Sequence, residues 1–196
     1  MGKVITQFTM SLDGFIADPQ DEVGRLLRWY FQGDTDFPVP GSGMNFKLSQ
    51  ASAALLQREW GAFGAIVTGK RDFDVSKAWG GKPPLAVPTF IITHHPPQEW
   101  IYPGSPFTFI TEGVAQAIAL AKAAAGERHI ALSGTQIVQQ GLQAGLVDAI
   151  YIDLAPILLG AGIRLFDHLS VAPIDLEITE VVEGTGVTHL RYRVIK

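Results

Sequence analysis

The sequence contains no cysteine, which excludes a disulfide framework, thiolate metal sites and a cysteine nucleophile. Charged residues are also sparse at 17% of 196 residues, and the formal net charge is −4. Because no long basic run is present, a nucleic-acid-binding surface is not expected. No apolar run approaches the roughly 18 residues that a membrane span needs. We therefore expect a cytoplasmic protein without a membrane partner.

The sequence is instead rich in apolar residues, at 47%, and its length suits one domain with a substantial core. Runs of β-branched and aromatic residues predict strands. These strands lie at residues 4–10, 65–68, 88–93, 107–111, 129–132 and 146–156. Apolar residues at helical spacing predict helices at 45–60, 73–79, 114–126 and from 135 onward.

The last third of the chain contains only predicted strands, at 175–183 and 187–195, around the hairpin signal at 184–186. Strands and helices alternate in the first two-thirds of the chain, and only strands follow. This order of elements predicts a mixed sheet with helices on both faces. The expected fold is therefore a single-domain α/β protein with three αβα layers, mostly parallel with an antiparallel C-terminal hairpin. His189, Arg191 and Arg193 share one face of the last strand, which we interpret as a solvated face; a dimer contact is the alternative.

A short turn, Ser133-Gly134-Thr135, joins a predicted strand to a predicted helix. Such a turn leaves backbone N–H groups without partners at the positive end of a helix dipole. Phosphate groups bind at helix starts for this reason. An ordinary helix start capped by Ser133 or Thr135 fits the same residues, so the turn alone leaves both interpretations open.

Familiar nucleotide and metal motifs are incomplete. Residues 64–71 follow a phosphate-binding P-loop as far as Lys70, but Arg71 stands where Ser or Thr would hold magnesium. Residues 160–162 lack the third glycine of the dinucleotide fingerprint. His94 and His95 are adjacent, and adjacent strand residues seldom converge on one metal. We expect neither NTP hydrolysis nor a metal site.

Small and basic residues follow several strands that we expect to be parallel neighbours, at 69–71, 93–95 and 133–135. Ligands of open α/β sheets bind outside the carboxyl ends of the strands. The three turns together predict a positively charged edge that suits a ligand with several phosphates. NADP(H) fits this edge better than NAD, since no Asp or Glu for a ribose diol is apparent at these turns.

A long loop at 20–43 carries several aromatic residues. Long loops in compact domains are often functional. Trp29 and Phe31 are candidates for stacking on a flat heterocyclic substrate, and anchors of the loop are the alternative. Asp34 and Asp36 lie in the same loop as alternative proton carriers.

Five segments resemble the dihydrofolate-reductase-like family, most closely the C-terminal reductase domain of the bifunctional riboflavin-biosynthesis enzyme. They are residues 11–17, 68–71, 93–94, 145–148 and, as the most specific, 155–166. The resemblance implies a mixed eight-stranded sheet, NADPH as hydride donor, a small-molecule substrate and a homodimer.

The resemblance also implies residue roles. Cofactor contacts would be Gly14 and Ile16 at the nicotinamide, Gly69, Lys70 and Arg71 at phosphates, Thr93 and His94 at the 2′-phosphate, and Gly134, Thr135, Gln136 and Ile137 at the pyrophosphate. Asp13 also borders the nicotinamide and is our candidate for positioning or proton delivery. Its alternative role is a turn aspartate that bonds its own backbone.

Departures from the family narrow the expected activity. Ser133 replaces a glycine, and the helix predicted at 45–60 offers only Glu59 for the carboxylate that folate reduction uses. We expect an NADPH-dependent reductase of a CH-OH, C=O or C=N group, resembling 5-amino-6-(5-phosphoribosylamino)uracil reductase. Alternatives are an NADP(H)-binding sensor without turnover, a dihydrofolate reductase, which the helix disfavours, and a structural dimer module.

Overall fold

A computed structural model describes residues 2–171 and 173–196. Its centre is an eight-stranded sheet with the order β11-β12-β9-β1-β8-β5-β6-β7. The strands are β1 (Val4–Ser11), β5 (Phe63–Gly69), β6 (Thr89–Ile92), β7 (Phe107–Ile110), β8 (His129–Leu132), β9 (Ala149–Ala155), β11 (Leu176–Gly184) and β12 (Val187–Val194). Neighbours from β9 to β7 are parallel, and β12 and β11 are antiparallel. The predicted mixed sheet is confirmed.

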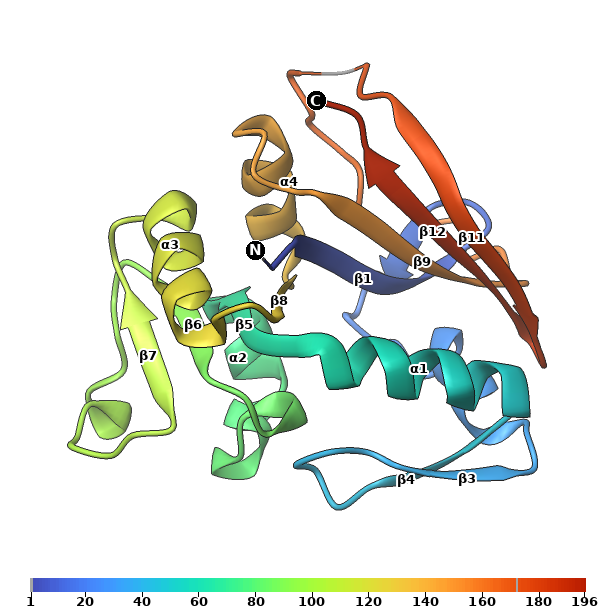
Figure 1. Ribbon diagram of the computed structural model, residues 1–196, viewed down its shortest axis with the longest axis horizontal. Helices are drawn as coiled ribbons and strands as arrows, with labels where there is room; N and C mark the ends of the chain where they lie inside the picture. Colours follow the sequence, from blue (N-terminus) through green and yellow to red (C-terminus); the bar gives the residue numbers. More distant parts are fainter. Residues whose placement is uncertain (1, 172) are drawn as a thin grey trace.

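Helices cover both faces of the sheet, as predicted. The helices are α1 (Gln50–Ala62), α2 (Lys70–Val75), α3 (Val114–Ala125) and α4 (Thr135–Gln143). Figure 1 shows α3 and α4 on one side of the sheet and α1 on the other. The main core, in which Val4, Ile130 and Leu132 are almost fully buried, lies under α3 and α4. Ile5 and Phe63 face the opposite layer with Trp60 of α1.

The predicted helix at 45–60 begins later than expected. Residues Asn45–Leu48 form β4, which pairs with β3 (Thr35–Pro38), and α1 starts only at Gln50. Polar and apolar residues alternate along β4, so Phe46 and Leu48 are buried while their neighbours are exposed. This period of two is that of a strand. Ser49 then caps α1 by accepting a hydrogen bond from the backbone N–H of Ser52 at 3.2 Å.

The helix predicted at 73–79 is also displaced. It runs from Lys70 to Val75 as α2, and the following turn, Lys77–Gly81, has a left-handed backbone. Trp79, with φ of 48°, lies in this turn instead of a helix. Its ring packs against Phe73 and Phe107, which fixes the turn on the edge of the sheet.

Short elements complete the chain. They are β2 (Phe15–Ala17), β10 (Ile163–Arg164) and single 3-10 turns at Leu26–Phe31, Pro84–Ala86 and Gln98–Trp100. The loop predicted at 20–43 therefore contains a 3-10 turn and β3. In the described part of the chain, no helix has the length and apolar character needed to cross a bilayer.

Candidate active site

The carboxyl ends of β1, β5, β6 and β8 meet at one edge of the sheet, because these strands are all parallel. This edge brings together the turns that begin at Asp13, Lys70, Thr93 and Gly134. Gly69 and Gly134 approach so closely that a Cβ on Gly134 would lie 3.3 Å from the backbone nitrogen of Gly69. The predicted convergence of strand ends is therefore present.

The turn before α4 has the features of an anion site. Gly134 has φ of 82° and supplies no side-chain cap to the helix. Within the described residues, the backbone N–H groups of Thr135, Gln136 and Ile137 make no hydrogen bonds, and the first helical bond runs from Val138 to Gly134. These three amides are free at the positive end of α4. The capped-turn alternative has no counterpart here, since neither Ser133 nor Thr135 caps α4.

Asp72 ties the two strand ends together. Its carboxylate accepts hydrogen bonds from Thr68 Oγ1 at 2.6 Å and from Ser133 Oγ at 3.0 Å. Ser133, which replaces a glycine of the family pattern, therefore has a structural partner on α2. For the predicted phosphate the turn still offers backbone amides, among them those of Thr135, Gln136 and Ile137.

The predicted phosphate-binding cations are held by neighbouring carboxylates. Lys70 forms an ion pair with Asp74 one helical turn away, at 2.5 Å. Arg71 pairs with Asp21 across the edge, and 74% of its side chain is exposed. Exposed ion pairs are weak and exchange readily for other anions. Both cations are thus accessible to an incoming phosphate.

The turn after β6 offers fewer fixed contacts. The side-chain oxygen of Thr93 accepts a hydrogen bond from the backbone N–H of His95 at 3.1 Å. His94 makes no hydrogen bond within the described residues. Their role at a 2′-phosphate stays a prediction.

Asp13 is a clamp between two loops. Its carboxylate accepts hydrogen bonds from Ser11 Oγ at 2.5 Å and from the backbone N–H groups of Leu159 and Gly160 at 3.1 and 2.7 Å. These bonds, that of Ser11 foremost, lower its pKa to about 2. Asp13 is therefore an ion at neutral pH, which favours positioning over proton delivery.

The loop that Asp13 holds is packed against β2. A Cβ on Gly162, which has φ of 145°, would lie 2.0 Å from the carbonyl oxygen of Ala17. Gly14, with φ of 89°, and the guanidinium of Arg164 lie beside the same turn. Ile16 of β2 is packed against the main core, and its place beside a nicotinamide stays a prediction.

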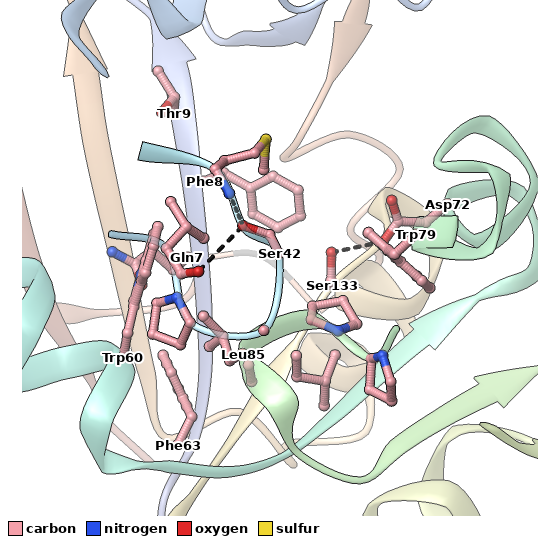
Figure 2. Close-up of a pocket in the computed structure, with 18 of the residues that line it drawn as sticks. Gln7, Phe8, Thr9, Ser42, Trp60, Phe63, Asp72, Trp79, Leu85 and Ser133 are labelled. Carbon is pink, nitrogen blue, oxygen red and sulfur yellow. Dashed lines mark hydrogen bonds between the residues drawn. The ribbon is translucent and has the colours of Figure 1, made fainter. Parts of the chain in front are cut away.

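A cavity of about 630 Å³ adjoins this edge on the α1 side of the sheet. Figure 2 shows Gln7 and Trp60 on one side of the cavity and Asp72, Trp79 and Ser133 on the other. Ser133 lines the cavity, and the free amides of α4 begin two residues after it, so they lie near this end of the cavity. Its volume falls in the usual range for small-molecule sites.

The aromatic loop contributes to the cavity through a residue that the sequence analysis did not choose. Tyr30 lines the cavity and stacks on Phe46 with ring centroids 4.2 Å apart and an interplanar angle of 11°. Burial raises the pKa of Tyr30, and the charge of Asp153 raises it further. Its hydroxyl is therefore a neutral group at physiological pH.

Trp29 and Phe31 do not line this cavity. Trp29 is 1% exposed and donates from Nε1 to Thr9 Oγ1 at 3.2 Å, whereas Phe31 is 64% exposed. The cavity gives their predicted stacking role no support, and Trp29 acts as the loop anchor. Asp36, the alternative proton carrier, pairs with Lys47 on the exposed β3–β4 hairpin.

A buried polar network lies behind the cavity, between α1 and the last strands. Arg191 forms a two-bond ion pair with Glu59, and its Nη2 also donates to Asp153 at 2.9 Å. Asp153 further bonds to His189, which bonds to Ser52 at 2.8 Å. Burial raises the pKa of Glu59, and the bond from Arg191 offsets this effect in part.

The interpretation of a solvated cationic face on the last strand is wrong for two of its three residues. His189 and Arg191 are 0% and 2% exposed, because α1 lies across this face and supplies hydrogen-bond partners. Arg193 alone remains exposed, and it pairs with Glu177 of β11. The three residues do share one face of β12, as the sequence predicted, but the sequence did not predict that α1 covers this face.

Most residues that line the cavity were not predicted from the sequence, among them the polar or aromatic residues Gln7, Tyr30, Trp60, Asp72 and Asp153. Gln7 and Asp153 were detectable, since each is a strongly polar residue within a predicted strand that is mostly apolar or β-branched. A polar group at such a position needs a buried partner or a ligand. The other three come from loops and helices whose placement depends on the fold.

Comparisons with solved structures identify the fold. A protein described as a riboflavin biosynthesis protein, from Shewanella sp. PV-4, is 22% identical, with a TM-score of 0.73 over 99% of both chains. The Thermotoga maritima diaminohydroxyphosphoribosylaminopyrimidine deaminase/5-amino-6-(5-phosphoribosylamino)uracil reductase is 12% identical, with a TM-score of 0.64 over 99% of this chain and 57% of that one. An Enterococcus faecalis dihydrofolate reductase complexed with NADP(H) is 13% identical, with a TM-score of 0.58 over 100% and 98%.

At these identities the solved structures establish the dihydrofolate-reductase-like fold alone. A comparison with the curated proteins found no match. The family model described as the RibD C-terminal domain matches residues 2–190, which is nearly the whole chain. The predicted family is confirmed: the chain belongs to the RibD C-terminal domain family, whose members are reductase-like.

Proposed function

We propose that the protein is an NADPH-dependent reductase that transfers a hydride to a small heterocyclic substrate. The observation that carries the proposal is the set of free backbone amides at Thr135, Gln136 and Ile137, next to a cavity of about 630 Å³. A phosphate site beside a ring-sized cavity suits a dinucleotide whose reactive end enters the cavity. The reductase in the Thermotoga protein and the NADP(H) complex of the Enterococcus enzyme support the same assignment.

The residues present fit this cofactor. The first turn of α4 would hold the pyrophosphate, because its amides are free and Gly134 leaves room above them. Arg71 would bind the 2′-phosphate, since its guanidinium is exposed at the same edge. When bound, the nicotinamide supplies the hydride.

The chain's own residues orient the substrate and exclude water. The stacked pair Tyr30 and Phe46, with Trp60, provides flat apolar walls for a ring. Asp13 holds the 158–160 loop against the end of β1 as a positioning residue. The raised pKa of Tyr30 keeps its hydroxyl protonated at neutral pH, so Tyr30 adds no charge to the cavity.

Substitution at Gly134 tests the proposal. Gly134→Asp places a Cβ and a negative charge in the anion cradle, and we expect NADPH binding to weaken by at least about 100-fold. Gly145→Asp is the matched control, because Gly145 also has a positive φ, of 65°, but follows the other end of α4. Binding is measured by the fluorescence of NADPH.

Turnover is measured separately, as NADPH oxidation at 340 nm with a panel of pterins and pyrimidines. Equal NADPH binding by the wild type and Gly134→Asp, or no binding by the wild type, would reject the proposal. If the protein binds NADPH tightly but no pterin or pyrimidine in the panel causes NADPH oxidation, the protein would be assigned the sensor role instead.

A further inference from the structure

The cavity that we assign to the substrate is lined by more negatively than positively charged side chains. Its charged lining residues are Asp72, Asp153 and Lys82, so carboxylates outnumber cations. Lys82 is exposed, and the buried Arg191 is already bonded to Glu59 and Asp153. A phosphate in a cavity needs several free cations or amides. The described cavity offers one cation.

Asp153 presents an incompletely bonded oxygen to this cavity. Its Oδ1 accepts hydrogen bonds from His189 Nδ1 at 2.7 Å and Arg191 Nη2 at 2.9 Å. Within the described residues, its Oδ2 has a single long hydrogen bond, from Gln7 Nε2 at 3.4 Å. The side chain is only 3% exposed, so bulk water does not satisfy this oxygen. A buried carboxylate oxygen favours a close N–H donor.

Gln7 adds a second acceptor beside the first. Its Nε2 donates to Glu59 Oε2 at 3.0 Å and to Asp153, which fixes the orientation of the amide. No hydrogen bond is made to its Oε1 within the described residues. Gln7 and Asp153 are diagonal neighbours on one face of the sheet, since Gln7 pairs with Tyr151 and Thr9 pairs with Asp153. Both side chains line the cavity.

We infer that the cavity binds an unphosphorylated flat heterocycle through its amino and ring N–H groups, with Asp153 and Gln7 as the specificity-determining residues. The inference rests on the proposed reductase function and narrows its substrate class. It separates this chain from a reductase of a phosphoribosyl substrate, such as the one named for the Thermotoga protein. The aromatic side chains of the cavity would pack against the faces of the ring. Asp153 and Gln7 would accept hydrogen bonds from the N–H groups at its edge.

A matched pair of ring ligands tests the inference on the full-length protein. Pterin and lumazine have the same bicyclic ring, but pterin carries an amino group where lumazine has an oxo group. A hydrogen bond to a charged group contributes about 1.5–3 kcal/mol. We therefore expect calorimetry to show pterin binding at least about tenfold more tightly than lumazine.

Two variants assign this preference to residues. Asp153→Asn and Gln7→Met should each reduce it to less than about threefold. Gln7→Met leaves the Glu59–Arg191 and Asp153–Arg191 bonds in place and gives a readout even if Asp153→Asn is unfolded. Glu180→Gln, which removes the same charge from an exposed pair with Arg58, should keep the full preference.

A second pair of ligands tests whether the cavity excludes phosphorylated substrates. Guanosine and guanosine 5′-monophosphate share an amino-bearing edge, and we expect the phosphate to give no gain in affinity. The inference is overturned if neither pterin nor lumazine binds, if both bind equally, if the preference survives Gln7→Met, or if the monophosphate binds about tenfold tighter. NADPH binding is measured on the same samples, so failure of the cofactor proposal is recognised independently of the ring preference.

Discussion

Glu59 and Arg191 form a buried ion pair with two parallel hydrogen bonds, Nε to Oε1 at 2.6 Å and Nη2 to Oε2 at 2.9 Å. The pair joins α1 to β12, and thereby fixes the helix that forms one wall of the cavity. Glu59 is the only carboxylate of α1, and its bonds are directed to arginine and Gln7. The carboxylate to which we assign the substrate is instead Asp153, on strand β9.

This pairing makes Arg191 a large contributor to stability. Removal of one partner of a buried ion pair costs about 3–5 kcal/mol, because the other charge is left without a partner. We expect Arg191→Met to lower the free energy of unfolding by that amount in urea denaturation. Arg193→Met, two residues along the same strand, removes an exposed pair and should cost less than about 1 kcal/mol. Equal losses in both variants would contradict the role of burial.

Acid stability should depend on Asp13. Its pKa is lowered from 3.8 to about 2 in the folded protein. The unfolded chain then binds more protons than the folded one at pH values between about 2 and 4. The stabilisation is full above this window and is lost as the pH falls through it.

We therefore expect the melting temperature of Asp13→Asn to lie below that of the wild type at pH 6, with the difference shrinking towards pH 2. Circular dichroism at a series of pH values measures it. Asp175→Asn is the control, since Asp175 is exposed and makes no side-chain hydrogen bond to the described residues. If the difference in melting temperature between the wild type and Asp13→Asn is the same at pH 6 and pH 2, the lowered pKa of Asp13 does not contribute to stability.

Cofactor preference should depend on Arg71. We expect Arg71→Ala to weaken NADPH binding by about 10- to 100-fold, through loss of a charge-assisted hydrogen bond to the 2′-phosphate. NADH lacks this phosphate, so its binding should change by less than about threefold. Arg58→Ala removes the same charge from an exposed pair with Glu180 and should leave both affinities unchanged. An equal loss for the two nucleotides would rule out this role of Arg71.

We propose that the edge strand β11 mediates a homodimer. Leu176, Ile178 and Val181 are 43%, 64% and 55% exposed, and they pair with residues of one face of β12. Exposed apolar residues on an edge strand favour association with another chain. Ile178→Glu should convert a dimer to a monomer in size-exclusion chromatography with light scattering. Ile101→Glu, at an exposed apolar site outside the sheet edge, should not. A wild-type monomer would contradict the proposal.

The element types were predicted where the sequence pattern has one period over a long stretch. The strands β1 and β8 and the C-terminal hairpin lie within about one residue of their expected positions. Errors occurred at Asn45–Leu48, where a short strand directly precedes a helix and the apolar residues fit both periods. Left-handed residues such as Trp79 are set by tertiary packing and were not foreseen.

The candidate site was predicted only in part, for a related reason. Turns after parallel strands share an edge, so Gly69 and Gly134 were placed together correctly from the order of elements alone. Cavity walls, in contrast, combine residues from α1, β1 and β9. Their meeting depends on how the helix crosses the sheet, which the period of a single element does not define. The same limit explains why His189 and Arg191 were expected at the surface.

The glycine-rich segment 158–162 lies within the stretch that most specifically resembles the family. It donates a hydrogen bond to Asp13 and packs against the backbone of Ala17. Its most restricted position, Gly162, is restricted by the neighbouring backbone. Similarity in this segment therefore indicates a shared scaffold and carries no information about the substrate. Relatives that share the segment should therefore be sorted by the residues they carry at positions 7 and 153, to which we assign the choice of substrate.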